Sequence, residues 1–156
     1  MTDQLKNNLS ALHLKAMAQH LDAVLLQSEE KNLSFSATLL HLTELEMERR
    51  WQTAIKLRWD QSRLPEKLSI DQFDFNHHKS RKEQKNRIVN LLNLVFIKER
   101  MDVIFIGNPG TGKTFLAECI GLAACNANIK VLFTSAMDMI NQLIAAEADH
   151  SLLKKL

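Results

Sequence analysis

The chain has 156 residues, enough for one ordinary domain or for two small domains with thin cores. Hydrophobic residues make up 46% of it and charged residues 24%, a globular composition that excludes a largely disordered protein. The net charge of +2 is too small to indicate a nucleic-acid partner by itself. No apolar run is long enough to cross a membrane and the first residues lack a signal peptide, so we expect a cytoplasmic protein with no membrane partner.

The first part of the chain is predicted to be helical. Leu5, Leu9 and Leu12 recur at helical spacing, and Leu21 and Leu25 continue the pattern after a small phase shift. This spacing indicates a helix with one apolar face.

A second helix is predicted to begin at Ser34 or Ser36, because serine is a favoured N-cap and a long stretch without glycine or proline follows. The segment ELEMERR, residues 44–50, is mostly charged and is expected to be solvated. The leucines expected to face inward are Leu39, Leu42 and Leu45.

A connector over residues 62–80 follows, since Pro65 discourages a helical residue before it and the composition is mixed and polar. Phe73 and Phe75 are its expected anchors. A third helix is predicted over residues 79–98 from its apolar spacing.

Two short apolar segments rich in β-branched residues come after Met101. DVIFI, residues 102–106, and KVLFTS, residues 130–135, are predicted strands buried on both faces. A helix is predicted between them, and Ser135 with Asp138 resembles a capping box that starts another helix. The sequence therefore predicts an α/β arrangement here.

Residues 107–114, GNPGTGKT, match the phosphate-binding pattern G-x-x-x-x-G-K-[ST] at every fixed position. A predicted strand precedes this loop, a predicted helix follows it, and three of the four glycines of the chain lie in it. Backbone N–H groups can wrap phosphates at little desolvation cost, and glycines permit that close approach. The alternative is a glycine-rich turn that binds no nucleotide, but the context favours a nucleotide phosphate site.

Each residue type of the loop has an expected role. Lys113 supplies a point charge to the β- and γ-phosphates, and the Thr114 hydroxyl suits a Mg²⁺ ion that keeps most of its waters. The helix after the loop directs the positive end of its dipole at the phosphates. Phe73 and Phe75 are candidates for packing near the base. The predicted nucleotide-binding residues are Gly107, Asn108, Pro109, Gly110, Thr111, Gly112, Lys113 and Thr114; Thr114 is the predicted metal ligand, and no catalytic residue is predicted.

The loop is similar to the GxPGTGKT variant of AAA+ ATPases. Together with LLHLTELEMERR, FDFNHHKSRKEQ and the stretch from Asp102 to Leu143, it makes the chain resemble the IstB-like insertion-sequence ATP-binding proteins, which are transposition helpers related to the DnaC helicase loader. The resemblance covers nearly the whole chain. It implies an α/β fold with a helical N-terminal domain and connector over residues 1–76. The first half of an AAA+ P-loop NTPase domain, with a partial parallel sheet, is then expected over residues 77–156.

The same resemblance implies ATP and Mg²⁺ as cofactors, a transposase as a partner, and DNA bound without sequence specificity. It leaves the oligomeric state open. Phe115 departs from the family, which often has histidine there. We also expect a C-terminally truncated chain, because members of this family run further. It is expected to lack the Walker B acids, because no apolar segment that ends in Asp or Glu follows the P-loop and Asp138 is read as a helix-start residue. ATP hydrolysis is then expected to be weak or absent.

Two basic stretches carry an open alternative. Residues 77–87 hold five lysines or arginines against one glutamate, and residues 49–63 interleave five with Trp51 and Trp59. They could neutralise DNA phosphates, or they could be solvated helix faces with tryptophans in the packing. Cys119 and Cys125 are expected to be reduced, half-buried thiols.

Two functions of different classes stay open. One is an ATP-binding helper of transposition. The other is a non-catalytic fragment whose helices form an interaction module for a transposase, a helicase or an intact relative. A small kinase or GTPase fits poorly, because such chains usually open with their P-loop.

Overall fold

The structure is a computed structural model that describes residues 2–148. The chain divides into two compact units, Met1–Ile55 and Lys56–Leu156, and each is described by itself. The domain boundary predicted between residues 76 and 77 stays a prediction.

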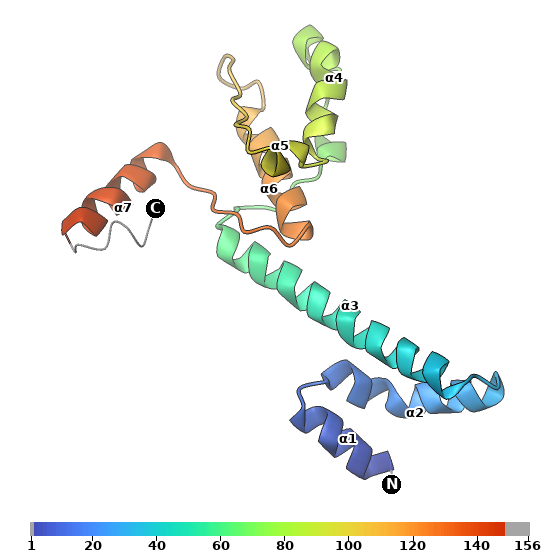
Figure 1. Cartoon of the computed structure of the whole chain (residues 1–156). Helices are drawn as coiled ribbons and strands as arrows, with labels where there is room; N and C mark the ends of the chain where they lie inside the picture. The colour runs from blue at the N-terminus through green and yellow to red at the C-terminus, as the bar shows by residue number, and fades with distance from the viewer. Residues whose placement is uncertain (1, 149–156) are drawn as a thin grey trace. The chain divides into compact units, whose positions relative to one another are not determined.

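The first unit is helical (Figure 1). Helix α1 spans Thr2–Ala11, α2 spans Lys15–Glu30, and α3, which spans Phe35–Ser62, begins in this unit. The turn between α1 and α2 contains His13 with a φ of 60°, and this turn explains the phase shift in the leucine pattern. Ser34 accepts a hydrogen bond from the N–H of Ala37 at 3.2 Å, which confirms the predicted start of α3. The buried core consists of Leu9, Met17, Leu21, Val24 and Leu42.

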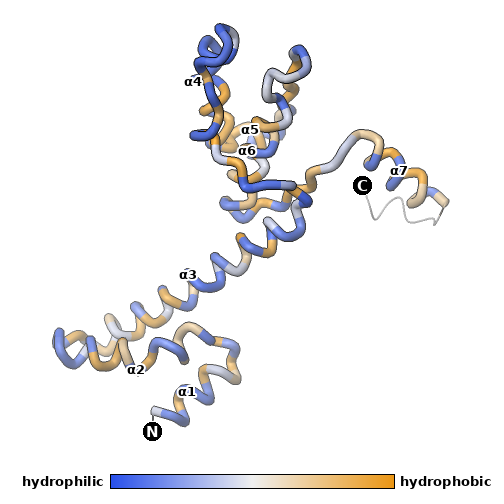
Figure 2. Tube along the Cα trace, turned by 180° about the vertical axis from the view of Figure 1, so that it is seen from behind, coloured by the Kyte–Doolittle hydropathy of each residue, from blue (hydrophilic) through white to orange (hydrophobic). Residues whose placement is uncertain are grey.

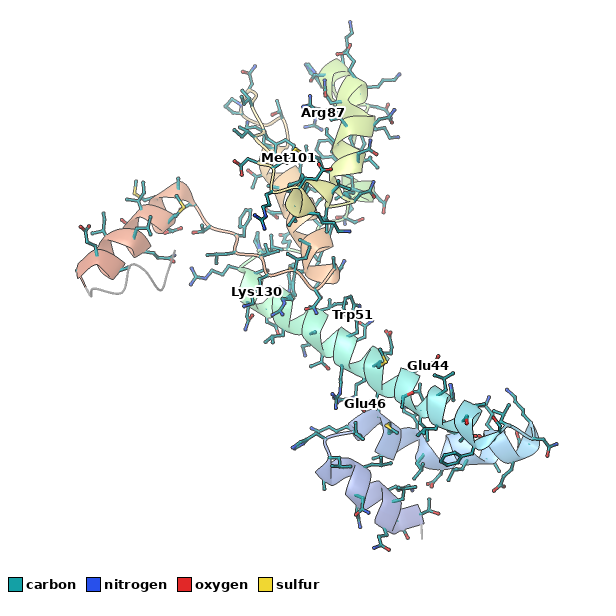
Figure 3. All side chains as sticks on the ribbon, in the orientation of Figure 1. Glu44, Glu46, Trp51, Arg87, Met101 and Lys130 are labelled. Atoms are coloured by element: carbon teal, nitrogen blue, oxygen red, sulfur yellow. The ribbon has the colours of Figure 1, made fainter. Side chains whose placement is uncertain are left out.

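The expectation that residues 44–50 are solvated is wrong for Glu46, whose side chain is only 4% exposed. Its carboxylate accepts a hydrogen bond from the N–H of Ala16 at 2.7 Å, in the first turn of α2. Arg49 and Arg50 donate to the same carboxylate at 2.7 and 2.9 Å. The hydrogen bond from Arg49, together with those from Arg50 and Ala16, lowers the pKa of Glu46 to about 2. Figure 3 labels Glu46 on the part of α3 that runs beside α2.

The second unit contains short helices joined by extended segments. A 3₁₀ turn, η1, spans Ile70–Gln72, and α4 spans Lys79–Leu91. Helices α5, α6 and α7 then span Val95–Lys98, Lys113–Asn126 and Ala136–Ala148. The helix expected over residues 79–98 is thus broken after α4, because Leu94 has a left-handed φ of 56°.

The predicted α/β fold with a partial parallel sheet is wrong for the described part of the chain, since residues 2–148 include no strand. A strand needs a neighbour that pairs with its backbone N–H and C=O groups. Segments 102–106 and 130–135 do not pair with each other; the N–H of Phe133 donates instead to the carbonyl of Ser62, at 2.7 Å. Ile104 is 80% exposed, so segment 102–106 is not buried on both faces either.

Helices α6 and α7 confirm several local predictions. Ser135 accepts from the N–H of Asp138 at 3.0 Å, and its hydroxyl donates to the Asp138 carboxylate at 2.6 Å, so Asp138 does stand at a helix start. Cys119 and Cys125 are free thiols on α6, and both are fully rather than half buried. Glu147, near the end of α7, is exposed. Within residues 2–148, no helix is both long and apolar enough to cross a membrane.

Candidate functional site

The predicted phosphate-binding loop, residues 107–114, leads into α6, and its last two residues form the start of that helix. Gly110 and Gly112 have φ values of 78° and 87°, in the left-handed region that side chains rarely adopt. Gly112 is the N-cap residue, and Lys113 is the first residue of the 14-residue helix. The two glycines therefore turn the chain sharply into α6, and the predicted glycine roles match the local backbone.

The backbone N–H groups of the loop have few partners. Within residues 2–148, none of the N–H groups from Gly110 to Thr114 donates a hydrogen bond to another residue, and the first helical bond at this end runs from the N–H of Leu116 to the carbonyl of Gly112. These donors lie at the positive end of the α6 dipole. Such a run of N–H groups at a helix N-terminus is suited to hold an anion.

Lys113 is folded back across the loop. Its ammonium group donates to the carbonyl of Gly107 at 2.9 Å and to that of Asn108 at 2.8 Å. The Thr111 hydroxyl donates to the same Asn108 carbonyl at 2.9 Å. These bonds hold the only side-chain cation of the loop sequence against the loop itself, where a bound phosphate would need it.

Thr114 lies exposed on the first turn of α6. Among the described residues, its hydroxyl takes part in no hydrogen bond with another side chain or with the backbone of the loop. A single hard oxygen donor of this kind fits Mg²⁺, which usually keeps several waters in a protein site.

The ring of Phe73 supports the loop from the connector. Phe73 is buried at 7% exposure, which confirms it as an anchor, and its ring lies 4.9 Å from that of Phe75 and 5.5 Å from that of Phe115. A Cβ added at Gly112 would lie 2.5 Å from Cε2 of Phe73. Position 112 therefore needs glycine both for its backbone conformation and for the close approach of this ring.

Sequence reasoning missed Arg81 as a residue of this site. Its guanidinium group donates from Nη2 to the carbonyl of Gly110 at 3.2 Å and from Nη1 to that of Asp74 at 3.1 Å. The guanidinium carbon lies 4.7 Å from the centre of the Phe73 ring. One signal was present in the sequence: a cation in the first turn of a helix opposes the helix dipole, so an arginine there calls for a partner.

A cavity of about 670 Å³ lies between α4, the segment after α5 and the start of α6. This volume falls in the range of small-molecule sites, whose walls are mostly apolar with a few polar groups. Figure 3 labels Arg87 on α4 and Met101 after α5, two of the residues that line it. Its cations are Arg81, Arg87 and Lys113, and its apolar walls include Phe73, Ile88, Leu91, Phe96 and Leu116.

Two other side chains with possible reactive or ligating groups, Cys119 and His78, lie outside the loop. Burial raises the pKa of the Cys119 thiol to about 11, so that thiol is protonated and unreactive at neutral pH. His78 caps α4, since its Nδ1 accepts from the N–H of Ser80 at 3.3 Å. In the described residues, histidine, cysteine and carboxylate groups form no cluster that could hold a metal ion.

The basic residues of α4 differ in exposure. Lys79, Lys82 and Lys85 are exposed, whereas Arg81 is half-buried against the loop. Figure 2 shows α4 as a largely hydrophilic helix. In the other basic stretch, Trp51 is 45% exposed, and Trp59 is half-buried with the Lys67 ammonium 5.1 Å from the centre of its ring. Arg81 of the first stretch and Arg58 of the second, whose Nε donates to the carbonyl of Asn128 at 3.3 Å, bind backbone carbonyls rather than carboxylates.

Comparison with known proteins finds relatives along the whole chain. The family model described as "IstB-like ATP binding protein" matches residues 7–156. The putative ATP-binding protein of insertion sequence IS5376 from Geobacillus stearothermophilus is 38% identical, over 100% of this chain and 61% of that protein. Its counterpart of IS232 from Bacillus thuringiensis subsp. berliner is 35% identical, over 98% and 60%.

A third relative, the putative ATP-binding protein of IS21 from Pseudomonas aeruginosa, is 31% identical, over 95% of this chain and 55% of that protein. The chain thus spans about three fifths of the length of the first two relatives. The family model takes in the whole loop and all but the first six residues of the chain. The chain belongs to the family of IstB-like ATP-binding proteins of insertion sequences.

Proposed function

We propose that these 156 residues bind the phosphates of ATP through residues 107–114. The observation that carries the proposal is the set of N–H groups from Gly110 to Thr114, which are not used by other described residues and lie at the positive end of α6. Gly110 and Gly112, whose backbone is left-handed, give the loop its turn, and the ammonium group of Lys113 lies against the loop. Membership in the family of IstB-like ATP-binding proteins supports ATP as the nucleotide.

Each part of the loop has a separate task in this proposal. The N–H groups replace water around the phosphate oxygens, which lowers the desolvation cost of binding a highly charged group. Lys113 exchanges its bonds to the carbonyls of Gly107 and Asn108 for bonds to phosphate oxygens and neutralises part of their charge. The α6 dipole adds to that field.

Thr114 is the residue that would hold Mg²⁺, through its exposed hydroxyl. When bound, the ion neutralises phosphate charge and helps to orient the phosphates. The cavity beside the loop, with its apolar walls, supplies room for the rest of the nucleotide.

We further propose that this chain hydrolyses ATP slowly if at all. Hydrolysis depends on acidic groups that orient the attacking water and the metal ion. Of the acidic residues after α6 that lie within residues 2–148, Asp138 is engaged in capping α7, and Glu147 lies exposed near the end of that helix. Neither of these two described residues is therefore a candidate for the acidic groups that hydrolysis needs.

The proposed biological role is that of an ATP-binding helper in DNA transposition, working with a transposase. The exposed lysines of α4 are the surface on which we expect DNA phosphates to bind, without sequence specificity. The alternative is a helical interaction module without turnover. Helix α3 favours this alternative, because Phe35, Leu40 and Met47 leave apolar surface exposed on the helix.

A titration with a fluorescent ATP analogue and Mg²⁺ tests the proposal. Lys113→Ala removes the loop cation, and Lys82→Ala, an exposed lysine of α4, is the matched control for loss of one positive charge. We expect saturable binding by the unchanged chain and by Lys82→Ala, and a loss of at least about tenfold in Lys113→Ala. Equal binding by all three, or no binding by the unchanged chain, would contradict the proposal. A phosphate-release assay then separates the helper with turnover from the module without it.

A further inference from the structure

Arg81 differs from the other basic residues around it. It stands in the first turn of α4, where the helix dipole disfavours a cation, and yet it is half-buried. Its neighbours Lys79 and Lys82 are exposed. The compensation comes from the loop and the connector, because the guanidinium group donates to one backbone carbonyl of each.

The bond to the loop fixes one particular peptide group. Nη2 of Arg81 lies 3.2 Å from the carbonyl oxygen of Gly110. The N–H of Thr111 belongs to the same planar trans peptide group, so it points in the opposite direction from that carbonyl. A carbonyl that is held toward Arg81 therefore holds the Thr111 N–H on the other side of the peptide, as a donor for an anion.

The bond to the connector makes this arrangement stiff. Nη1 of Arg81 binds the carbonyl of Asp74 at 3.1 Å, while the guanidinium carbon lies over the Phe73 ring, 4.7 Å from its centre. The same ring occupies the space beside Gly112 that a Cβ would need. A planar fork with several donors can hold two acceptors at once, whereas an ammonium group on a flexible stem cannot fix both in this way.

We propose that Arg81 is a positioning residue of the phosphate-binding loop: it holds the Gly110 carbonyl and the Phe73 ring so that the loop is preorganised for nucleotide phosphates. This inference rests on the proposed ATP binding, which gives a preorganised loop its purpose. The contacts of Arg81 themselves are made with protein groups and involve no nucleotide. Preorganisation lowers the ordering cost of binding, so loss of Arg81 weakens nucleotide binding without removing a group that the nucleotide must touch.

Glycine-selective ¹⁵N labelling gives a direct test on the full chain. The chain has four glycines, of which Gly107, Gly110 and Gly112 report on the loop and Gly121, in the middle of α6, is an internal control. In Arg81→Ala without nucleotide, we expect the amide signals of Gly110 and Gly112 to shift and their order parameters to fall from about 0.85 to below about 0.6. The Gly121 signal stays unchanged, which shows that the helix is still folded.

Two further variants sharpen the test. Lys82→Ala removes an exposed charge one residue away and should leave all four glycine signals unchanged. Arg81→Lys keeps the charge but not the fork, and it should fail to restore the order of Gly110 and Gly112. Full restoration by lysine would show that charge alone matters, and unchanged loop signals in Arg81→Ala would show that Arg81 does not hold the loop; either result overturns the inference.

Addition of ATP and Mg²⁺ to the same samples separates this inference from the proposed function. If the unchanged chain shows no shift of its loop glycines with ATP, the proposed function fails, while the comparison without nucleotide still decides the role of Arg81. If the unchanged chain does bind, we expect Arg81→Ala to bind about five- to tenfold more weakly, the effect of losing one charge-assisted hydrogen bond. Unchanged affinity would contradict the positioning role.

Discussion

Substitution of Gly112 by alanine disturbs the phosphate-binding loop in two ways that have separate sizes. A φ of 87° costs an L residue about 1–2 kcal/mol relative to glycine. The new Cβ would also lie 2.5 Å from Cε2 of Phe73, so the ring must move, and overpacking of this kind costs about 1–3 kcal/mol. We therefore expect Gly112→Ala to lower the free energy of unfolding of the second unit by about 2–5 kcal/mol.

Gly110→Ala is the matched control for the backbone part of this cost. Gly110 has a similar φ of 78°, but a Cβ there would meet nothing within 4 Å. It should lose only about 1–2 kcal/mol. Adding Phe73→Leu to Gly112→Ala, with Phe73→Leu alone as its reference, should recover the steric part, because the ring edge that meets the Cβ is gone.

Urea unfolding followed by tryptophan fluorescence measures these differences. The chain has two tryptophans, and in a Trp51→Phe background Trp59 remains as the reporter of the second unit. Equal losses for Gly110→Ala and Gly112→Ala, or no recovery in the double variant, would refute the argument that the Phe73 ring packs against position 112.

Two other predictions concern Glu46 and the thiols. Glu46→Gln should lower the free energy of unfolding of the first unit by about 2 kcal/mol at neutral pH, since the carboxylate binds Ala16, Arg49 and Arg50 and two of these partners are partly exposed. Because folding lowers the pKa of Glu46 from 4.5 to about 2, this stabilisation is present above pH 4.5 and is lost as the pH falls through about 2. Urea unfolding of both proteins by circular dichroism over that range checks it, and a pH-independent difference would contradict it. Cys119 and Cys125 should resist a thiol reagent in the native protein and react once urea unfolds it, because burial raises the pKa of both thiols; rapid labelling of either one without urea would contradict their burial.

Local features of this fold were predictable from the sequence. Ser34 and Ser135 start helices because a serine hydroxyl satisfies an N–H group within a few residues, and that signal lies entirely in the neighbouring sequence. Gly110 and Gly112 adopt left-handed backbone for the same kind of local reason.

The errors concern features that depend on residues far away in the sequence. Segment 102–106 has the apolar, β-branched composition of a buried strand, but a strand also needs a neighbouring strand, and none pairs with it within residues 2–148. Glu46 reads as part of a charged, solvated face until Ala16, 30 residues earlier, is seen to donate to it. Arg81 reads as one of five basic residues until its bond to Gly110, 29 residues later, is known.

The measurement that tests the central claim most directly is a calorimetric titration of the chain with ATP and Mg²⁺, beside the same titration with adenosine. The loop offers its N–H groups and Lys113 to phosphate oxygens, so the phosphates should supply most of the affinity. We predict saturable binding of ATP, no measurable binding of adenosine, and loss of the ATP signal in Lys113→Ala. Equal binding of ATP and adenosine, or ATP binding that Lys113→Ala leaves intact, would contradict a phosphate site at residues 107–114.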